Sequence, residues 1–230
     1  MRQDEYQRLR ATTFVEQLGW DIPVDAEGRE RDRYDCLADT SIRTYGTYGH
    51  NAHTEHLLGG MRIFSLQRWE DSMVFNEFRA AGIIPDGAIR QLKAQYDCHN
   101  MLELTRFCVR RGRWYMPSSV HTKVPFSCII ARDLTFASAC AVAEETGRQQ
   151  ALILVDAAYF RVLRKSHFIF AEISHGLDVS LIVIDIWATI QAIRLAGERS
   201  QADRMLALCC RGNKVATDNW RQQKSSVIQH

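Results

Sequence analysis

The stretch MLELTRFCV, residues 101–109, decides the fold of this chain. Its run of apolar residues predicts a buried strand, but the run also contains Glu103 and Arg106. A charge inside such a strand needs a partner, because an unpaired buried charge is costly. The two residues are three apart and would point to opposite faces of a regular strand. If both serve one site, the strand must contain a bulge between Leu102 and Phe107.

Helices and strands alternate on the C-terminal side of this stretch. Periodicity predicts, in chain order, a helix over 134–146, a strand over 151–155, a helix over 157–166, and strands over 168–173 and 181–186. A last helix is predicted over 199–210. This alternation predicts an α/β (α+β) fold in which helices flank a mixed central sheet. Because no linker or repeat is visible, we expect a single domain over residues 1–212 and a polar tail over 213–230.

The N-terminal half is less regular. An amphipathic helix is predicted from Asp4, as its N-cap, to near Gly19. Residues 21–52 show little periodicity, so we expect irregular structure with room for short strands. A strand is predicted over 56–64, where Gly59 and Gly60 indicate a bulge or a close approach of another segment. Helices are predicted over 70–81 and 87–95.

Charge and composition argue against several classes of protein. With 29 basic and 27 acidic residues, the chain has too little excess positive charge for a dedicated nucleic-acid binder. The longest apolar stretch, residues 181–190, contains Asp185 and is far shorter than the roughly 20 residues of a membrane-spanning helix. The first residues lack the apolar core of a secretory signal, and seven scattered cysteines without a CxxC pair fit reduced thiols. We therefore expect a cytoplasmic protein that binds neither nucleic acid nor membrane.

A second group of polar residues resembles a site rather than a solvated surface. Arg62, like Glu103, lies in an apolar strand and needs a partner. Asp32 and Asp35 belong to a charge run over residues 30–35, which taken alone could be solvated surface. We predict one connected ion-pair network near Trp20, made by Asp32, Asp35, Arg10, Arg62 and Arg106.

In this order and spacing, these residues resemble the autoinducer synthases, the acyl-homoserine-lactone synthase family, whose fold is GNAT-like. The family pattern is an arginine with a phenylalanine four residues later, Leu-x-Trp, Asp-x-x-Asp, a strand arginine and Glu-x-x-Arg-Phe. It is met here by Arg10, Phe14, Leu18, Trp20, Asp32, Asp35, Arg62, Glu103, Arg106 and Phe107. The resemblance covers about residues 5–190 and depends on the combination, because each piece alone is common. The segment between Asp35 and Arg62 is longer than the family usually has, and His167-Phe168 stands where many members carry Gly-Trp.

The resemblance implies an acyltransferase that makes N-acyl-homoserine lactones for quorum sensing. Its substrates would be S-adenosylmethionine and a thioester of acyl carrier protein or coenzyme A, and no cofactor or metal is expected. Glu103 would be the base that deprotonates the substrate amine, provided that burial raises its pKa. Asp32 and Asp35, held by arginines that include Arg106, would face the ammonium and sulfonium. Backbone N–H groups near Phe107 would stabilise the oxyanion.

The remaining site residues follow from the same resemblance. Arg10, Phe14, Trp20, Arg62 and Phe107 would contact substrate, and the acyl chain would lie against Phe126, Ile129, Ile130, Leu152 and Ile153. Arg161, Arg164 and Lys165 share one face of the helix over 157–166 and would dock the acidic carrier protein. Arg110, Arg111 and Arg113 form a second basic group that could reach the pantetheine phosphate.

Other interpretations remain open. An N-acyl amino acid synthase on the same scaffold would need the same base and carboxylate clamp but no sulfonium site. A non-catalytic sensor of acyl thioesters or carrier protein would not need the acidic and arginine residues together. Residues 50–56 hold three histidines and a glutamate, a spacing like that of metal ligands, but the neighbouring glycines favour a surface loop.

Overall fold

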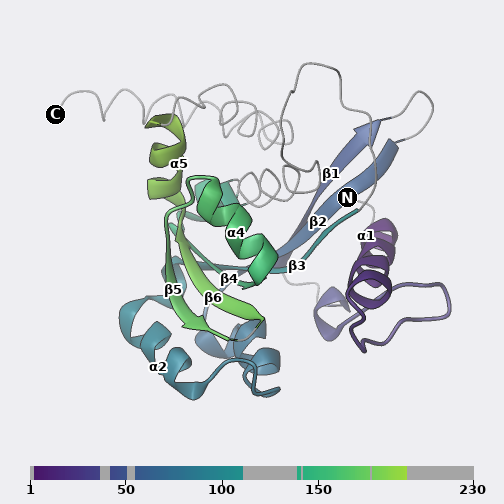
Figure 1. Cartoon of the computed structure of the whole chain (residues 1–230), viewed down its shortest axis with the longest axis horizontal. Coiled ribbons are helices and arrows are strands. Elements are labelled where there is room, and N and C mark those ends of the chain that lie inside the picture. The colour runs from purple at the N-terminus through teal and green to yellow at the C-terminus, as the bar shows by residue number, and fades with distance from the viewer. Residues whose placement is uncertain are drawn as a thin grey trace.

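The computed structural model describes residues 3–36, 42–50, 55–110, 139–140, 142–176 and 178–195. Six strands form one sheet in the order β1-β2-β3-β4-β6-β5 (Figure 1). Their bounds are β1 Ile42–His50, β2 Glu55–Ser65, β3 Met101–Val109, β4 Gln150–Asp156, β5 Phe170–His175 and β6 Val179–Asp185. Only β3 and β4 are parallel, and all other neighbours are antiparallel. The predicted mixed sheet is therefore confirmed.

Helices cover both faces of this sheet. The α-helices are α1 Gln3–Ala11, α2 Asp86–Gln95, α4 Ala157–Lys165 and α5 Ile186–Leu195. Residues 139–140 and 142–146 are also helical. One face packs against α4 and α5 through side chains such as Met61, Leu104 and Ile153. The opposite face packs against α2 through Phe64 and Leu152, and against α1 through Leu57 and Cys108. None of the described helices is long and apolar enough to cross a membrane.

Shorter helical turns connect these elements. They are the π-helix η1 Thr12–Gln17, the 3₁₀ turns η2 Arg33–Cys36, η3 Trp69–Asp71 and η5 Cys98–Asn100, and the π-helix η4 Val74–Phe78. The predicted first helix is confirmed as α1 followed by η1, but α1 starts at Gln3, so Asp4 lies in its first turn and not at the N-cap. The helical stretch predicted over 70–81 is confirmed in part, because it consists of the two short turns η3 and η4 and not of one continuous helix.

Two further differences concern element boundaries. Residues 42–50, expected to be irregular, form the nine-residue edge strand β1, which is stabilised by pairing with β2. The strand predicted over 181–186 is confirmed as β6, but the helix α5, which starts at Ile186 directly after it, is not among the predicted elements. Asp185 starts this helix by accepting the N–H of Ala188 at 2.7 Å. The predicted helix over 199–210 and the polar tail lie outside the described residues.

The sheet opens between β3 and β4. Their register runs only from Met101, opposite Gln150, to Leu104, opposite Ile153. Both strands continue past this point, β3 to Val109 and β4 to Asp156, without further pairing in that register. The central strands therefore diverge toward one end, and the candidate site lies there.

Candidate active site

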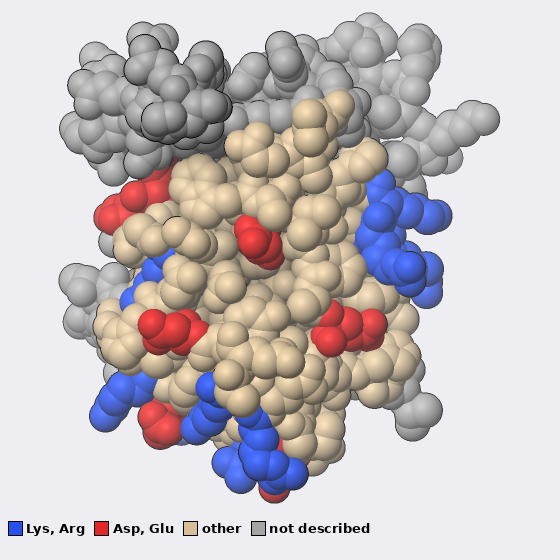
Figure 2. All heavy atoms as spheres, turned by 90° about the vertical axis from the view of Figure 1, so that its left-hand side faces the viewer, with Lys and Arg blue, Asp and Glu red and all other residues tan. Residues whose placement is uncertain are grey.

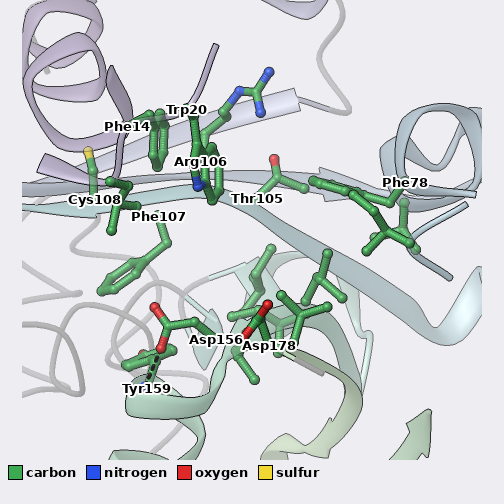
Figure 3. A pocket seen from close by; sticks show the side chains of 18 of the residues that line it. Phe14, Trp20, Phe78, Thr105, Arg106, Phe107, Cys108, Asp156, Tyr159 and Asp178 are labelled. Carbon is green, nitrogen blue, oxygen red and sulfur yellow. Dashed lines mark hydrogen bonds between the residues drawn. The ribbon is translucent and has the colours of Figure 1, made fainter. Parts of the chain in front are cut away.

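A pocket of about 790 Å³ occupies the divergence of β3 and β4 (Figure 3). Phe14, Trp20 and Arg106 line it on the α1 side of the sheet, while Phe107 and Tyr159 line it on the α4 side. The rings of Phe14 and Trp20 stack with their centroids 5.1 Å apart, and those of Phe107 and Tyr159 stack at 4.9 Å. The pocket thus joins two aromatic-walled halves across the sheet.

A bulge in β3 makes this two-sided arrangement possible. Arg62 pairs with Thr105 and Gly60 pairs with Cys108, so Arg106 and Phe107 together stand opposite the single residue Met61. Arg106 has a φ of 50°, the left-handed conformation that residues other than glycine rarely adopt. Its guanidinium carbon lies 5.9 Å from the centre of the Phe14 ring, whereas Phe107 packs against the α4 side. The predicted irregularity between Leu102 and Phe107 is confirmed.

The predicted ion-pair network is present beside the α1 half of the pocket. Arg10 donates to both carboxylate oxygens of Asp35 at 2.7 Å. Arg62 donates to both oxygens of Asp32, at 2.8 and 2.6 Å, and lies 3.2 Å from Asp35. Arg106 donates its Nε to Asp32 at 3.0 Å. All five predicted members are connected, and Asp32 links Arg62 to Arg106.

Electrostatics fix the charge state of this network. Burial alone would raise the pKa of Asp32, but the hydrogen bond and charge of Arg62, with Arg106 and Arg10, lower it to about 2. The contribution of Asp32 to stability is therefore present above pH 4 and is lost as the pH falls through 2. Since their oxygens are taken up by arginines and neither residue lines the pocket, Asp32 and Asp35 hold the arginines in place.

Two carboxylates that the sequence interpretation did not select also contact the network. Glu30 is fully buried, accepts from Nε of Arg10, and has Oε1 3.4 Å from Arg106. Within the described part of the chain, Glu77, on η4, has only long ion-pair contacts, of 3.9 Å to Arg106 and to Arg33. Burial raises the pKa of Glu77, and Arg106 opposes this rise. These long contacts make Glu77 the carboxylate of this group that arginines engage least. Its neighbours Val74 and Phe78 line the pocket, although Glu77 itself does not.

Glu103 is fully buried on the same face of the sheet. Its Oε1 accepts the N–H of Val74 at 3.1 Å, while Oε2 has no hydrogen-bond partner among the described residues. Burial raises its pKa to about 7, although the Ser72 hydroxyl, the backbone N–H groups of Val74 and Met73 and the charge of Arg62 act in the opposite direction. Glu103 does not line the pocket, but Val74 does. The expectation of a desolvated carboxyl with a raised pKa is confirmed.

The other predicted site residues separate into three groups. Ile153 lines the pocket, whereas Leu152 belongs to the core against α2. The expectation that Leu152 lines the acyl pocket is therefore wrong, because successive residues of a strand face opposite sides of the sheet. Arg10 and Arg62 are buried in the network and do not line the pocket. Phe126, Ile129, Ile130, Arg111 and Arg113 lie outside the described residues. Arg110 is engaged by β2, because its Nε donates to the carbonyl of Leu57 at 3.2 Å.

The predicted docking face on α4 is exposed. Arg161, Arg164 and Lys165 are exposed and have no ion pair with the described carboxylates. An open groove of about 460 Å³ lies beside Arg164 and is lined by Phe160, Phe168, Ile169, Phe170 and Glu172. Figure 2 shows Lys and Arg side chains in separate groups near the edges of one face, with mostly uncharged surface between them.

A metal site is not assigned. The centre of the histidine segment, residues 51–54, lies outside the described residues. Elsewhere, the ligand atoms of Asp97, Cys98 and His99 lie within 4.8 Å of one another. Burial raises the pKa of the Cys98 thiol, which disfavours the thiolate that a metal would bind, and none of the three lines the pocket.

The comparisons place this geometry among known proteins. TofI, solved in a ternary complex with an inhibitor and MTA, is 22% identical over 83% of this chain and 88% of its own, with a TM-score of 0.56. LasI, described as an AHL synthase, is 19% identical over 80% of this chain and 82% of its own, with a TM-score of 0.53. BjaI, described as a CoA-dependent acyl-homoserine lactone synthase with SAM and isopentyl-CoA, is 17% identical over 88% of this chain and 81% of its own, with a TM-score of 0.54.

These structures share the fold at identities too low to carry more than that. No curated protein matches the chain significantly by sequence. The family model described as autoinducer synthase, however, matches residues 1–188, a range that contains the network, the bulge and the whole pocket. This chain belongs to the autoinducer synthase family.

Proposed function

We propose that this chain makes N-acyl-homoserine lactones for quorum sensing from S-adenosylmethionine and an acyl thioester. Membership of the autoinducer synthase family makes it an enzyme, an acyltransferase. The chain shares its fold with three solved structures. TofI is described with MTA, LasI is described as an AHL synthase, and BjaI is described with SAM and isopentyl-CoA. We place the reaction in the cytoplasm, where both substrates are made.

The pocket that crosses the sheet is the observation that carries this proposal. On the α1 side, Arg106, Phe14 and Trp20 offer a cation and two stacked rings, which suit the carboxylate and adenine of S-adenosylmethionine. On the α4 side, the walls formed by Phe107, Ile153 and their neighbours are largely apolar and suit an acyl chain. An amine bound on one side and a thioester bound on the other would meet beside the Arg106–Phe107 peptide.

The substrate amine must lose a proton before it attacks. Its pKa is near 8, so it is mostly protonated at neutral pH. A carboxyl with a pKa of about 7 is well matched to accept this proton, which supports Glu103 as the base. Because Glu103 lies behind Val74, the proton would pass through water. Glu77, which arginines engage least, would receive the ammonium before deprotonation.

Lactone closure requires little from the chain. The carboxylate oxygen of the bound amino acid attacks its own γ-carbon, and the thioether leaves as methylthioadenosine. The sulfonium already makes a good leaving group, so the pocket contributes mainly by folding the bound substrate. No step needs a metal or a redox cofactor, and we propose that none is used.

The face of α4 formed by Arg161, Arg164 and Lys165 would dock an acyl carrier protein. Its exposed charges, which form no ion pair with the described carboxylates and lie next to a groove lined by aromatic residues and Glu172, suit an acidic protein that presents an acyl chain. Coenzyme A thioesters remain the alternative donor, as described for BjaI.

Mass spectrometry tests this function. The purified chain is incubated with S-adenosylmethionine and a panel of acyl-CoA and acyl-carrier-protein thioesters. An acyl-homoserine lactone together with methylthioadenosine is the expected product. An open-chain acyl amino acid formed from free amino acids would instead identify an N-acyl amino acid synthase. Thioester binding without turnover would identify a sensor.

A further inference from the structure

A buried tyrosine on α1 contacts the bulge that divides the pocket. The side chain of Tyr6 is buried, with 1% of the residue exposed. Its hydroxyl donates to the backbone carbonyl of Arg106 at 2.6 Å, across 100 residues of sequence. No pattern in the sequence singles out Tyr6, which the amphipathic periodicity of α1 presents as an ordinary core residue.

The ring of Tyr6 occupies the space that Gly60 leaves free by having no side chain. A Cβ added to Gly60 would lie 2.4 Å from Cδ2 of the Tyr6 ring, so only glycine leaves room for it. Gly60 also pairs with Cys108, at the border of the register shift that creates the bulge. The tyrosine ring therefore lies directly over the irregular part of the β2–β3 ladder.

The bulge needs such a contact because its conformation is unfavourable by itself. Arg106 has a φ of 50°, a conformation that costs a residue with a side chain on the order of 1 kcal/mol. Neither Arg106 nor Phe107 has a partner in the register with β2, and the register with β4 ends at Leu104. The hydrogen bond from Tyr6 is thus one of few restraints on the peptide that joins them.

This restraint also sets the direction of an N–H group. The peptide between Arg106 and Phe107 is trans, so its carbonyl and its N–H point in opposite directions. With the carbonyl held toward Tyr6 on the α1 side, the N–H of Phe107 is directed away from α1. Phe107 itself lines the pocket, next to the divergence of β3 and β4.

We propose that Tyr6 is a positioning residue for acyl transfer: its hydroxyl holds the Arg106–Phe107 peptide so that the N–H of Phe107 faces the thioester oxygen. This inference rests on the proposed function. As the amine nitrogen bonds to the thioester carbon, the carbonyl π electrons move onto oxygen, and the N–H of Phe107 donates to that oxyanion. When the carbonyl re-forms, the C–S bond breaks, and the thiolate takes up the proton released by the amine. A hydrogen bond to the peptide carbonyl also strengthens its N–H as a donor.

Replacing Tyr6 with phenylalanine tests the proposal, because the ring stays over Gly60 and only the hydroxyl is lost. Loss of one oxyanion donor typically costs 10²–10³ in turnover, so a loosened donor is expected to lower the rate of thiol release about tenfold. The KM for S-adenosylmethionine is expected to stay within about twofold, since the donor acts in the transition state. Tyr96→Phe, which removes a hydroxyl from a tyrosine packed against the α2 core, is the matched control and should leave both values unchanged.

Two backgrounds separate positioning from general packing. Arg106→Ala and Arg106→Gly both remove the guanidinium, but only glycine adopts a positive φ without cost. In the Arg106→Ala background, adding Tyr6→Phe should therefore lower the rate of thiol release about tenfold. In the Arg106→Gly background, adding Tyr6→Phe should lower that rate much less. If turnover is too slow to measure, amide hydrogen exchange of residues 104–109 is the readout, with faster exchange expected on loss of the hydroxyl except beside glycine.

Three outcomes would overturn the proposal. These are an unchanged rate in Tyr6→Phe, an effect of equal size in both Arg106 backgrounds, and a rise in KM for S-adenosylmethionine that accounts for the whole loss. Failure of the wild-type chain to make any lactone would instead refute the proposed function. In that case, the exchange measurement still decides whether Tyr6 holds the bulge.

Discussion

Replacing Glu103 with glutamine is expected to change how the stability of the fold depends on pH. The carboxyl is fully buried, and its pKa is raised from 4.5 to about 7, chiefly by burial. The difference corresponds to about 3 kcal/mol between the protonated and ionised forms. Glutamine keeps an oxygen that can accept the N–H of Val74, so the fold should persist in the variant.

The sign follows from proton binding. The folded state holds the proton of Glu103 more tightly than the unfolded state does. The stabilisation is therefore complete below pH 4.5 and is lost as the pH rises through about 7. Between pH 5 and pH 8, the free energy of unfolding of the wild type should fall by about 2 to 3 kcal/mol more than that of Glu103→Gln. Other titrating groups are common to both proteins and cancel in this difference.

Urea unfolding at several pH values between 5 and 8 measures the effect. Glu16→Gln, which changes an exposed glutamate on η1, serves as the control and should follow the wild type. Parallel curves for the wild type and Glu103→Gln would refute the reasoning, because Glu103 would then titrate as it does in the unfolded chain. The same result would remove the support for Glu103 as a base matched to neutral pH.

Three other changes have defined outcomes. Replacing Arg164 and Lys165 with glutamate should raise the KM for an acyl carrier protein at low salt and leave the KM for S-adenosylmethionine unchanged; equal carrier KM values would show that this face is only solvated surface. Glu77→Gln should raise the KM for S-adenosylmethionine about threefold to tenfold, as expected for the loss of one charged hydrogen bond. Steady-state kinetics measures this KM, and an unchanged value would show that Glu77 does not receive the ammonium. Gly60→Ala should lower the free energy of unfolding by about 1 to 3 kcal/mol, because its Cβ would overlap the ring of Tyr6, and a neutral result in urea unfolding would mean that α1 can shift freely.

Local pattern was enough for the elements that are buried on both faces or clearly amphipathic. β3 has the predicted bounds of Met101–Val109, and α2 and α4 are within a residue of their predicted ranges. Such segments are specified by their own apolar periodicity, so contacts with neighbouring segments have little influence on where they begin and end. The mixed sheet with flanking helices followed from the order of these elements, whereas the GNAT-like class came from the resemblance to the autoinducer synthases.

Segments that depend on other segments were predicted less well. β1 is an edge strand with many polar residues, and only pairing with β2 makes it a strand. The segment over 70–81 has helical periodicity, but the N–H of Val74 is bound by the Glu103 carboxylate, 29 residues away, at the start of η4. The start of α5 lay inside a continuous apolar run, where periodicity cannot separate strand from helix.

The sequence by itself determined which residues of the site needed partners. Arg62, Glu103 and Arg106 stand in apolar strands, and the cost of an unpaired buried charge required opposite charges nearby. The sequence also predicted Asp32 and Asp35 as partners of the arginines. The tertiary structure decided which arginine each of them binds, and it added Glu30 and Tyr6. The reason is physical: a bulge and a glycine bring Tyr6 to a carbonyl 100 residues away, and no local pattern encodes a contact over that separation.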